Sequence, residues 1–231
     1  MHTIYFDYAA TTPLDPRVFS AMEPYLKEEF GNPSSIYTFA QHARNAIDDA
    51  REKTAAILGC HPKEILFTGS GTESNNLAMI GIAEAYAQKG KHIVTTKIEH
   101  DSVLEPLKYL ETKGFEVTYL DVSEDGIVSA SDVIKAVRPD TILVSVIYAN
   151  NEIGTIQPIA EIGGALREFR EKSNADPGIS LLPYFHTDAC QAAAFLPLLV
   201  KDCAVDLMTV NGGKIHGPKG VGVLYVKKGV K

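Results

Sequence analysis

EILFTGSGTESNNLAMIGIAEAYAQKGKHIVTT, residues 64–96, combines two apolar runs with a helical segment between them. The first run (64–68) leads through a glycine-rich turn into a helix expected from about Thr72 to Gln88, and the second run covers 92–96. The alternation then continues, with strands expected at 115–120, 141–147, 183–187, 205–210 and 221–226 and helices at 101–113, 131–138 and 159–172. Strands that alternate with helices of about a dozen residues are typical of βαβ units. The sequence therefore predicts an α/β fold with a seven-stranded, mostly parallel sheet flanked by helices.

The residues before this alternating region predict two more helices. Asp15 followed by Pro16 combines an N-cap with a proline at the first helical position, and opens a helix toward Phe30. The next helix is amphipathic and ends at Gly59. Its apolar positions, spaced by four and three residues, are Ala43, Ile47, Ala50, Thr54 and Ile57.

Two loops are also expected. A polar segment with Pro and Gly at 171–179 predicts an exposed loop. The turn Gly217-Pro218-Lys219-Gly220 is able to reverse the chain, which allows the last strand to run antiparallel. No internal repeat or low-complexity stretch interrupts the pattern.

The composition is that of a globular protein: of 231 residues, 45% are hydrophobic and 22% charged. A formal net charge of −7 argues against nucleic acid or an anionic membrane as a partner held by bulk electrostatics. No apolar run reaches the ~18 residues that a membrane helix needs, and no secretory signal is recognised at the start. Three widely spaced cysteines (Cys60, Cys190 and Cys203) without metal-ligand pairing predict a cytoplasmic protein with neither a disulfide framework nor a metal site.

Polar clusters follow several of the expected strands, at the edge of the sheet where α/β proteins bind ligands. The glycine-rich turn at 68–76 begins a helix, whose free N–H groups favour a phosphate, although such a turn also serves packing alone. Glu99-His100 offers a base or an aromatic platform, or merely a helix cap. Asn150-Asn151 offers two amides to a ligand, or to a turn.

Asp188 and Lys214 add two charges to this edge. Asp188 ends an apolar strand, where a partly buried carboxylate needs a cationic partner unless it only caps the following helix. Lys214 lies among glycines in NGGKIHGPKG (211–220), where a desolvated lysine becomes an amine nucleophile, although a lysine in such a loop is more often a solvated charge. Taken together, the amine, the carboxylate and the glycine-rich helix start are the parts that a pyridoxal-phosphate (PLP) site requires.

Nine motifs carry a resemblance to a known family. They are YFDYAATTPLDPRV (5–18), FGNPSS (30–35), FTGSGTESNNLA (67–78), EH (99–100), FEVTYL (115–120), DTILVSV (140–146), NNEIGTIQPI (150–159), DACQ (188–191) and VDLMTVNGGKIHGPKGVGVLYV (205–226). In this order and along nearly the whole chain, the sequence resembles the cysteine desulfurases of class V of the PLP-dependent aminotransferases. The resemblance implies the large domain of a fold-type-I PLP-dependent transferase.

The resemblance also implies a reaction and its catalytic residues. Lys214 would form the Schiff base with PLP, Asp188 would pair with the pyridinium nitrogen, and His100 would stack on the ring and move protons. Sulfur would be removed from L-cysteine, leaving L-alanine and a persulfide for iron–sulfur cluster assembly or tRNA thiolation. A homodimer and a sulfur-acceptor protein, such as an iron–sulfur scaffold, are the implied partners.

Further cofactor contacts are implied around these residues. Gly71 and Thr72 would hold the phosphate, while Asn151 and Gln191 would lie near the phenolic oxygen. Two positions depart from the family, whose members usually have a serine and a histidine that grip the phosphate. Here these positions hold Asn211, which still donates a hydrogen bond, and Gly213, which offers only its backbone.

The family's members are longer than this chain, which bears on the expected domains. Residues 1–35 are expected to be an N-terminal segment that packs with a C-terminal small domain, and residues 36–231 to be the PLP-binding large domain. The small domain is expected to be absent here, together with the family's nucleophilic cysteine and the arginine that binds the substrate carboxylate. The resemblance therefore implies that the three cysteines are structural and that residues 1–231 alone are catalytically incomplete.

Two other functions fit the same sequence. One is a related class V enzyme, a selenocysteine lyase or an aminotransferase, which the cysteine-bearing loop would distinguish. The other is a non-catalytic PLP-binding or scaffold protein, if the natural chain ends at Lys231.

Overall fold

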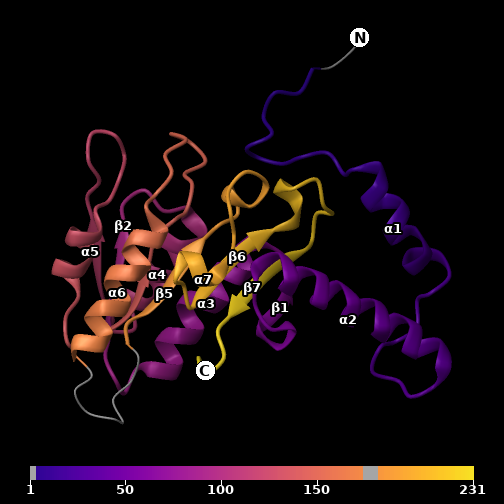
Figure 1. Ribbon diagram of the computed structural model, residues 1–231, viewed down its shortest axis with the longest axis horizontal. Coiled ribbons are helices and arrows are strands. Elements are labelled where there is room, and N and C mark those ends of the chain that lie inside the picture. Colours follow the sequence, from indigo (N-terminus) through magenta and orange to yellow (C-terminus); the bar gives the residue numbers. More distant parts are fainter. Residues whose placement is uncertain (1–3, 174–181) are drawn as a thin grey trace.

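The computed structural model describes residues 4–173 and 182–231, and its strands form one sheet in the order β1-β7-β6-β5-β4-β2-β3 (Figure 1). Six strands share one direction: β1 (Ile65–Thr68), β2 (His92–Thr96), β3 (Glu116–Leu120), β4 (Thr141–Ser145), β5 (Tyr184–Asp188) and β6 (Leu207–Asn211). β7 (Gly222–Val226) lies between β1 and β6 and is antiparallel to both. The predicted seven-stranded, mostly parallel sheet is confirmed, with an antiparallel last strand.

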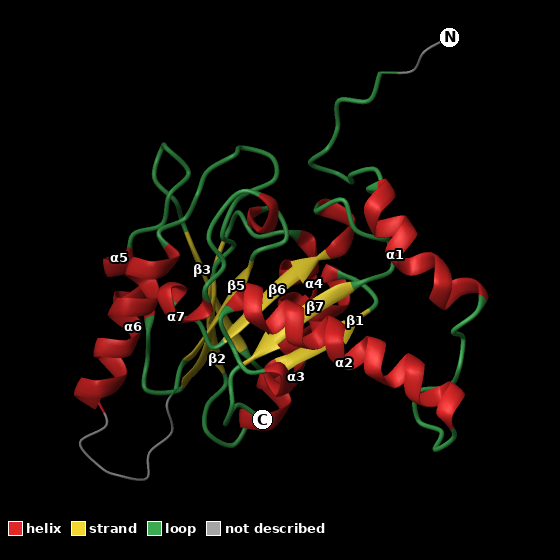
Figure 2. Cartoon of the chain, turned by 45° about the vertical axis from the view of Figure 1, so that its right-hand side comes forward, coloured by secondary structure: helices red, strands yellow, loops and turns green. Residues whose placement is uncertain are grey.

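Helices cover both faces of the sheet (Figure 2). α3 (Gly71–Tyr86) and α4 (Asp101–Glu111) share one hydrophobic core, whereas α5 (Ala130–Ala136), α6 (Ile159–Ser173) and α7 (Val200–Cys203) contribute to another. Neighbouring residues of β2 join different cores, Ile93 the first and Val94 the second. This follows from the pleat, which turns successive side chains to opposite faces of a strand.

Two helices at the N-terminus extend away from the sheet at the right of Figure 1, α1 (Pro16–Lys27) and α2 (Thr38–Leu58). The predicted cap of α1 is confirmed, because Asp15 Oδ1 accepts a hydrogen bond from the backbone N–H of Arg17 at 2.7 Å. The predicted end of α2 is confirmed as well. Gly59 adopts the left-handed conformation (φ 66°) that ends helices and suits glycine.

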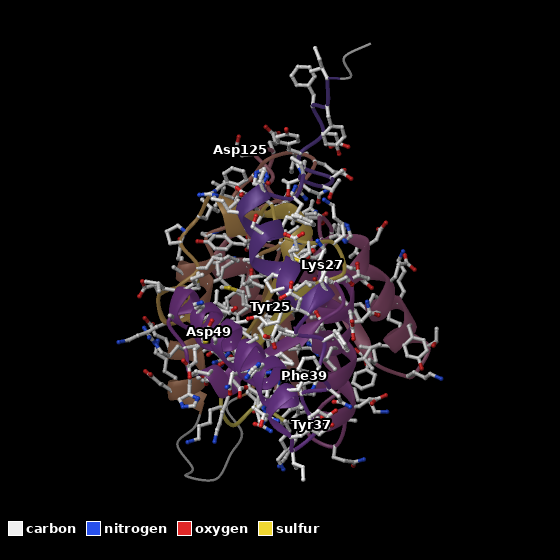
Figure 3. All side chains as sticks on the ribbon, turned by 90° about the vertical axis from the view of Figure 1, so that its right-hand side faces the viewer. Tyr25, Lys27, Tyr37, Phe39, Asp49 and Asp125 are labelled. Atoms are coloured by element: carbon white, nitrogen blue, oxygen red, sulfur yellow. The ribbon has the colours of Figure 1, made fainter. Side chains whose placement is uncertain are left out.

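The apolar stripe of α2 faces α1 rather than the sheet. A groove of about 1070 Å³ runs between the two helices, and Ala43, Ile47 and Ala50 line it together with apolar residues of α1. Ile57, the last member of the stripe, is 68% exposed. Figure 3 looks onto this side of the molecule, with Tyr25 of α1 and Asp49 of α2 labelled.

The predicted boundaries of strands and of the helices from α3 to α6 differ from the observed ones by at most two residues. The short α7 was not predicted. The loop expected at 171–179 begins later than predicted, because α6 continues to Ser173; residues 174–179 of that loop lie outside the described residues. In the described part of the chain, no helix combines the length and the apolar character needed to cross a membrane.

Candidate active site

A cavity of about 570 Å³ lies at the carboxyl ends of the parallel strands. Its walls come from the segments that follow β1, β2, β4, β5 and β6, so the sheet brings residues from distant parts of the sequence to one edge. Of the nine cofactor residues implied by the sequence, eight line this cavity: Gly71, Thr72, His100, Asn151, Asp188, Gln191, Asn211 and Lys214. The ninth, Gly213, is buried next to it but is not part of its wall.

Asp188 presents a carboxylate at the end of β5 and is only 4% exposed. Its Oδ1 accepts the backbone N–H of Cys190 at 2.9 Å, while its Oδ2 accepts an amide N–H of Asn75 at 2.7 Å. The first contact caps the local turn, and the second is a tertiary contact to α3. Asp188 thus stabilises the turn and also lines the cavity, where a buried carboxylate favours a cationic partner.

Asn75 links Asp188 to His100. One N–H of its amide bonds to Asp188, and the other donates to Oγ of Ser102 at 2.8 Å. The reverse amide orientation would place an oxygen against the carboxylate, so the donors must face Asp188 and Ser102. Oγ of Ser102 in turn lies 2.8 Å from Nδ1 of His100. A continuous chain of hydrogen bonds therefore runs from Asp188 to His100.

This network determines the tautomer of His100. Nδ1 accepts the backbone N–H of Ser102 at 3.0 Å, so His100 caps α4, the alternative that the sequence left open. A nitrogen that accepts this bond carries no proton, which leaves the ring proton of a neutral His100 on Nε2. Because His100 also lines the cavity, it is both a helix cap and a cavity residue.

The glycine-rich turn brings the start of α3 to the cavity. Ser70 caps the helix by accepting the N–H of Glu73 at 3.0 Å, and α3 begins at Gly71. A Cβ atom on Gly71 would lie 2.6 Å from Sγ of Cys190, so only glycine allows this close approach. The N–H groups of the first helical turn have no partners within the helix, and Gly71 and Thr72 place them at the cavity wall. The arrangement suits an anion such as phosphate.

The two asparagines after β4 have different surroundings. Asn150 shapes the turn, because its Oδ1 accepts the N–H groups of Glu152 and Ile153 at 2.8 and 3.0 Å. Asn151 lines the cavity and is available to a ligand. The amide nitrogen of Gln191, which also lines the cavity, donates to the carbonyl of Ala9 at 3.1 Å and so ties the N-terminal segment to the cavity wall.

Asn211 and Lys214 complete the cavity after β6. Oδ1 of Asn211 accepts the N–H of Gly213 at 3.1 Å, so this oxygen caps the turn and the amide nitrogen is the group left for a ligand. The two lysines of the loop differ. The ammonium of Lys219 donates to the carbonyl of Thr12, whereas Lys214 lines the cavity. Of these two lysines, Lys214 is therefore the one at the cavity wall.

Several titratable groups of the chain have shifted pKa values, and Glu99 and Cys190 among them lie near this edge. Burial raises the pKa of Glu99 to about 8, although hydrogen bonds from Thr96 and Ile147 act in the opposite direction. Burial lowers the pKa of His186 to about 4, so this histidine is neutral at neutral pH. Burial also raises the pKa of all three thiols, that of Cys60 to about 11, and all three are free. Protonated thiols are poor nucleophiles.

Neither Asn75 nor Ser102 was predicted as a site residue, although Asn75 lies within the motif at 67–78 and Ser102 follows the motif at 99–100. Asn75 occupies the buried face of α3 together with Ala78 and Met79 and is itself fully buried. An amide on the apolar face of a helix needs a buried polar partner, and that pattern was the available signal. Ser102, two residues after His100, gave no such signal.

Comparison with known proteins identifies the family. Residues 4–231 match the Aminotransferase class-V family. The chain belongs to this family. It is 51% identical over 99% of its length to "Cysteine desulfurase IscS" of Dictyoglomus turgidum, and 50% identical over its full length to "Putative cysteine desulfurase IscS 1" of Bacillus subtilis. It covers 55% and 58% of these two proteins, so the chain spans little more than half the length of the curated relatives it matches.

Two solved structures are similar to the fold of this chain. The structure described as "NIFS-LIKE PROTEIN" superposes with a TM-score of 0.91 at 39% identity, over 98% of this chain and 60% of that one. The structure "SspA in complex with cysteine" superposes with a TM-score of 0.88 at 42% identity, over 97% of this chain and 61% of the other. Members of the family depend on PLP, and the cavity described above has the groups that this cofactor requires.

Proposed function

We propose that this chain is the PLP-binding part of a cysteine desulfurase, which removes sulfur from L-cysteine, leaves L-alanine and passes the sulfur on as a persulfide. One observation carries the proposal: a single cavity gathers Lys214, the buried carboxylate of Asp188 and the N-terminus of α3. The relatives named cysteine desulfurase and the structure of SspA in complex with cysteine support L-cysteine as the substrate.

The cavity fits PLP at three points. The first turn of α3, with the amide nitrogen of Asn211, would hold the phosphate at the cavity wall. Asp188 would face the ring nitrogen, and Lys214 would bind the cofactor covalently. When bound, PLP supplies an electron sink that weakens the bonds at the α-carbon of an amino acid.

The chain's own residues would orient the cofactor and move protons. The carboxylate of Asp188 would keep a proton on the ring nitrogen, because a buried negative charge stabilises a neighbouring cation. His100 would stack on the ring and exchange protons at Nε2, since Nδ1 is engaged by Ser102. Asn151 and Gln191 would donate amide N–H groups near the phenolic oxygen.

We do not assign the sulfur-carrying role to any of the three cysteines. Cys190 lines the cavity, but it is buried within the turn after Asp188, and burial raises its pKa well above the ordinary value. Cys60 and Cys203 lie outside the cavity. We therefore propose that all three are structural thiols.

The proposal extends to the domains and partners. Residues 1–35 would pack with a small domain and residues 36–231 would form the large domain; the apolar groove between α1 and α2 supports this, because it offers space for a further element. Exposed apolar side chains on α3 and α4, Leu77 and Tyr109, support a homodimer. We also propose a sulfur-acceptor protein, such as an iron–sulfur scaffold, as a partner. A cytoplasmic location is proposed because the three thiols are free.

The test is covalent labelling of Lys214. The purified chain is mixed with PLP, its visible absorbance is recorded, and borohydride reduction followed by peptide mapping locates the label. We expect the label on Lys214, and the matched variant Lys219→Ala should keep it. A label on Lys219 would refute the assignment.

A second test concerns Asp188. In Asp188→Asn we expect PLP to bind while exchange of the α-proton of amino acids slows by orders of magnitude. Unchanged exchange would mean that Asp188 only caps the turn.

A further inference from the structure

Thr12 forms hydrogen bonds with the chain on both sides of Lys214. Its hydroxyl donates to the carbonyl oxygen of Gly213 at 3.1 Å and accepts the backbone N–H of His216 at 2.8 Å. Its backbone N–H donates to the same carbonyl of Gly213 at 2.9 Å. Thr12 is 5% exposed, so water competes little for these bonds. One side chain thus connects the residue before Lys214 with the second residue after it, across a sequence separation of 201 residues from Gly213.

The residues around Thr12 extend this contact. The hydroxyl of Thr11 also donates to the carbonyl of Gly213, at 3.1 Å, so three donors surround that oxygen. The N–H of Asp15 donates to the carbonyl of His216 at 3.0 Å, and the ammonium of Lys219 donates to the carbonyl of Thr12. The N-terminal segment and the Lys214 loop therefore form one hydrogen-bonded unit.

The backbone of His216 requires such support. Its φ of 60° lies in the left-handed region, which costs energy for a residue other than glycine and persists only when neighbouring groups hold it. Three hydrogen-bonding groups of residues 12–15 hold it: the hydroxyl of Thr12 accepts its N–H, the N–H of Asp15 donates to its carbonyl, and the carbonyl of Pro13 lies 3.1 Å from its Nδ1.

We propose that Thr12 is a positioning residue that fixes the backbone on both sides of Lys214 and so keeps its amine at the cavity. Asp7, Ala9 and Ala10 of the same N-terminal segment line that cavity. The hydrogen bonds between residues 11–15 and the Lys214 loop therefore also hold one wall of the cavity in place. The inference rests on the proposed function in that PLP is the group toward which Lys214 is positioned. The hydrogen bonds themselves are independent of PLP.

The test compares Thr12→Val, which keeps the shape and the backbone N–H but loses the hydroxyl, with Thr12→Ser, which keeps the hydroxyl. Without PLP, amide hydrogen exchange at His216 should be about 2- to 10-fold faster in Thr12→Val, the factor that corresponds to loss of one ordinary hydrogen bond. With PLP and borohydride, labelling of Lys214 should fall relative to Lys219. Thr12→Ser should restore both values at an unchanged unfolding midpoint, which a general loss of stability would not explain.

Thr11→Val is the matched control, because it removes a hydroxyl from the carbonyl of Gly213 and leaves the bond to His216 intact. It should not change exchange at His216. Unchanged exchange or unchanged Lys214 labelling in Thr12→Val overturns the proposal. If Thr12→Val does not fold, the amide exchange rate of His216 is measured in the unmodified chain. His216 is an exposed residue, so an amide that exchanges as freely as in a peptide would exclude its hydrogen bond to Thr12. If PLP labels no lysine in the unmodified chain, the proposed function fails, while the exchange measurements still judge the contact of Thr12.

Discussion

The amide nitrogen of Asn75 lies 2.7 Å from the carboxylate oxygen Oδ2 of Asp188. The two residues are buried, belong to α3 and β5, and stand 113 positions apart in the sequence. Because the other carboxylate oxygen of Asp188 accepts the N–H of Cys190, the two contacts together hold the carboxylate in one orientation. These contacts therefore fix α3 to the end of β5, where Asp188 is the proposed partner of the ring nitrogen.

Asn75→Leu should lower the free energy of unfolding by about 2 kcal/mol, the range for a hydrogen bond to a charged group. Leucine has a similar volume but leaves Oδ2 of Asp188 and Oγ of Ser102 without their donor. Urea unfolding of the chain without cofactor measures the change. Asn76→Ala is the control, because the amide of this half-buried neighbour bonds only to backbone carbonyls. Equal losses in both variants would contradict the assigned role of Asn75.

Gly71→Ala should destabilise the chain although alanine favours helices, because the new Cβ would lie 2.6 Å from Sγ of Cys190. Overpacking of this kind costs about 1–3 kcal/mol. Cys190→Ala removes the sulfur, so the double variant should recover most of the loss. Unfolding free energies of the two single variants and the double variant give the coupling, and simple additivity would show that the two residues do not clash.

The sequence predicted the sheet well because its strands are buried. β2, β4 and β5 are buried at every residue, and each contains adjacent apolar residues, as expected for central parallel strands covered on both faces. The orientation of α2 was harder to predict. Its apolar stripe, including Ile47, indicated a buried face, but a periodic pattern does not specify what that face packs against. In the structure, the stripe and α1 line the two sides of one groove.

Residues of the candidate site also differ in how well they could be predicted from the sequence. The positions of Asp188 and Lys214 at the cavity were predictable, because ligands of α/β proteins bind at the carboxyl ends of parallel strands. Asn75 and Thr12 were not, since each acts through a contact with a residue more than a hundred positions away. Such contacts depend on how helices and loops pack, and a single sequence carries little information on this.

Asp206→Asn should cost about 3–5 kcal/mol, as expected when one partner of a buried ion pair is removed. Asp206 is 2% exposed, and its carboxylate accepts hydrogen bonds from Arg170 at 2.7 Å, from Lys227 at 3.0 Å and from the N–H of Phe185 at 2.9 Å. The variant leaves the buried charge of Arg170 uncompensated. Chemical denaturation measures the loss, and Asp49→Asn, which breaks an exposed pair with Lys53, should change stability by less than about 1 kcal/mol. Similar effects of both changes would refute the prediction.

Glu99 and His186 predict opposite trends of stability with pH. The pKa of Glu99 is raised by burial from 4.5 to about 8, so the folded chain binds the extra proton, and this stabilisation is complete below pH 4.5 and lost as the pH rises through 8. The pKa of His186 is lowered by burial from 6.5 to about 4, so the unfolded chain binds more protons. The contribution of His186 is present above pH 6.5 and is lost as the pH falls through 4. Between pH 6.5 and pH 8, the free energy of unfolding therefore changes through Glu99 and not through His186.

Glu99→Gln tests this directly, because glutamine keeps the shape and an acceptor for Thr96 but does not titrate. The free energy of unfolding of the unmodified chain should fall by about 2 kcal/mol from pH 6.5 to pH 8, at about 1.4 kcal/mol per pH unit, whereas Glu99→Gln should remove this decrease. Glu105→Gln, at an exposed position of α4, is the control and should follow the unmodified chain. Urea unfolding of the three proteins at the two pH values gives the six free energies needed. A decrease of the same size in Glu99→Gln would mean that Glu99 is already ionised at pH 6.5 and that another group titrates in this range.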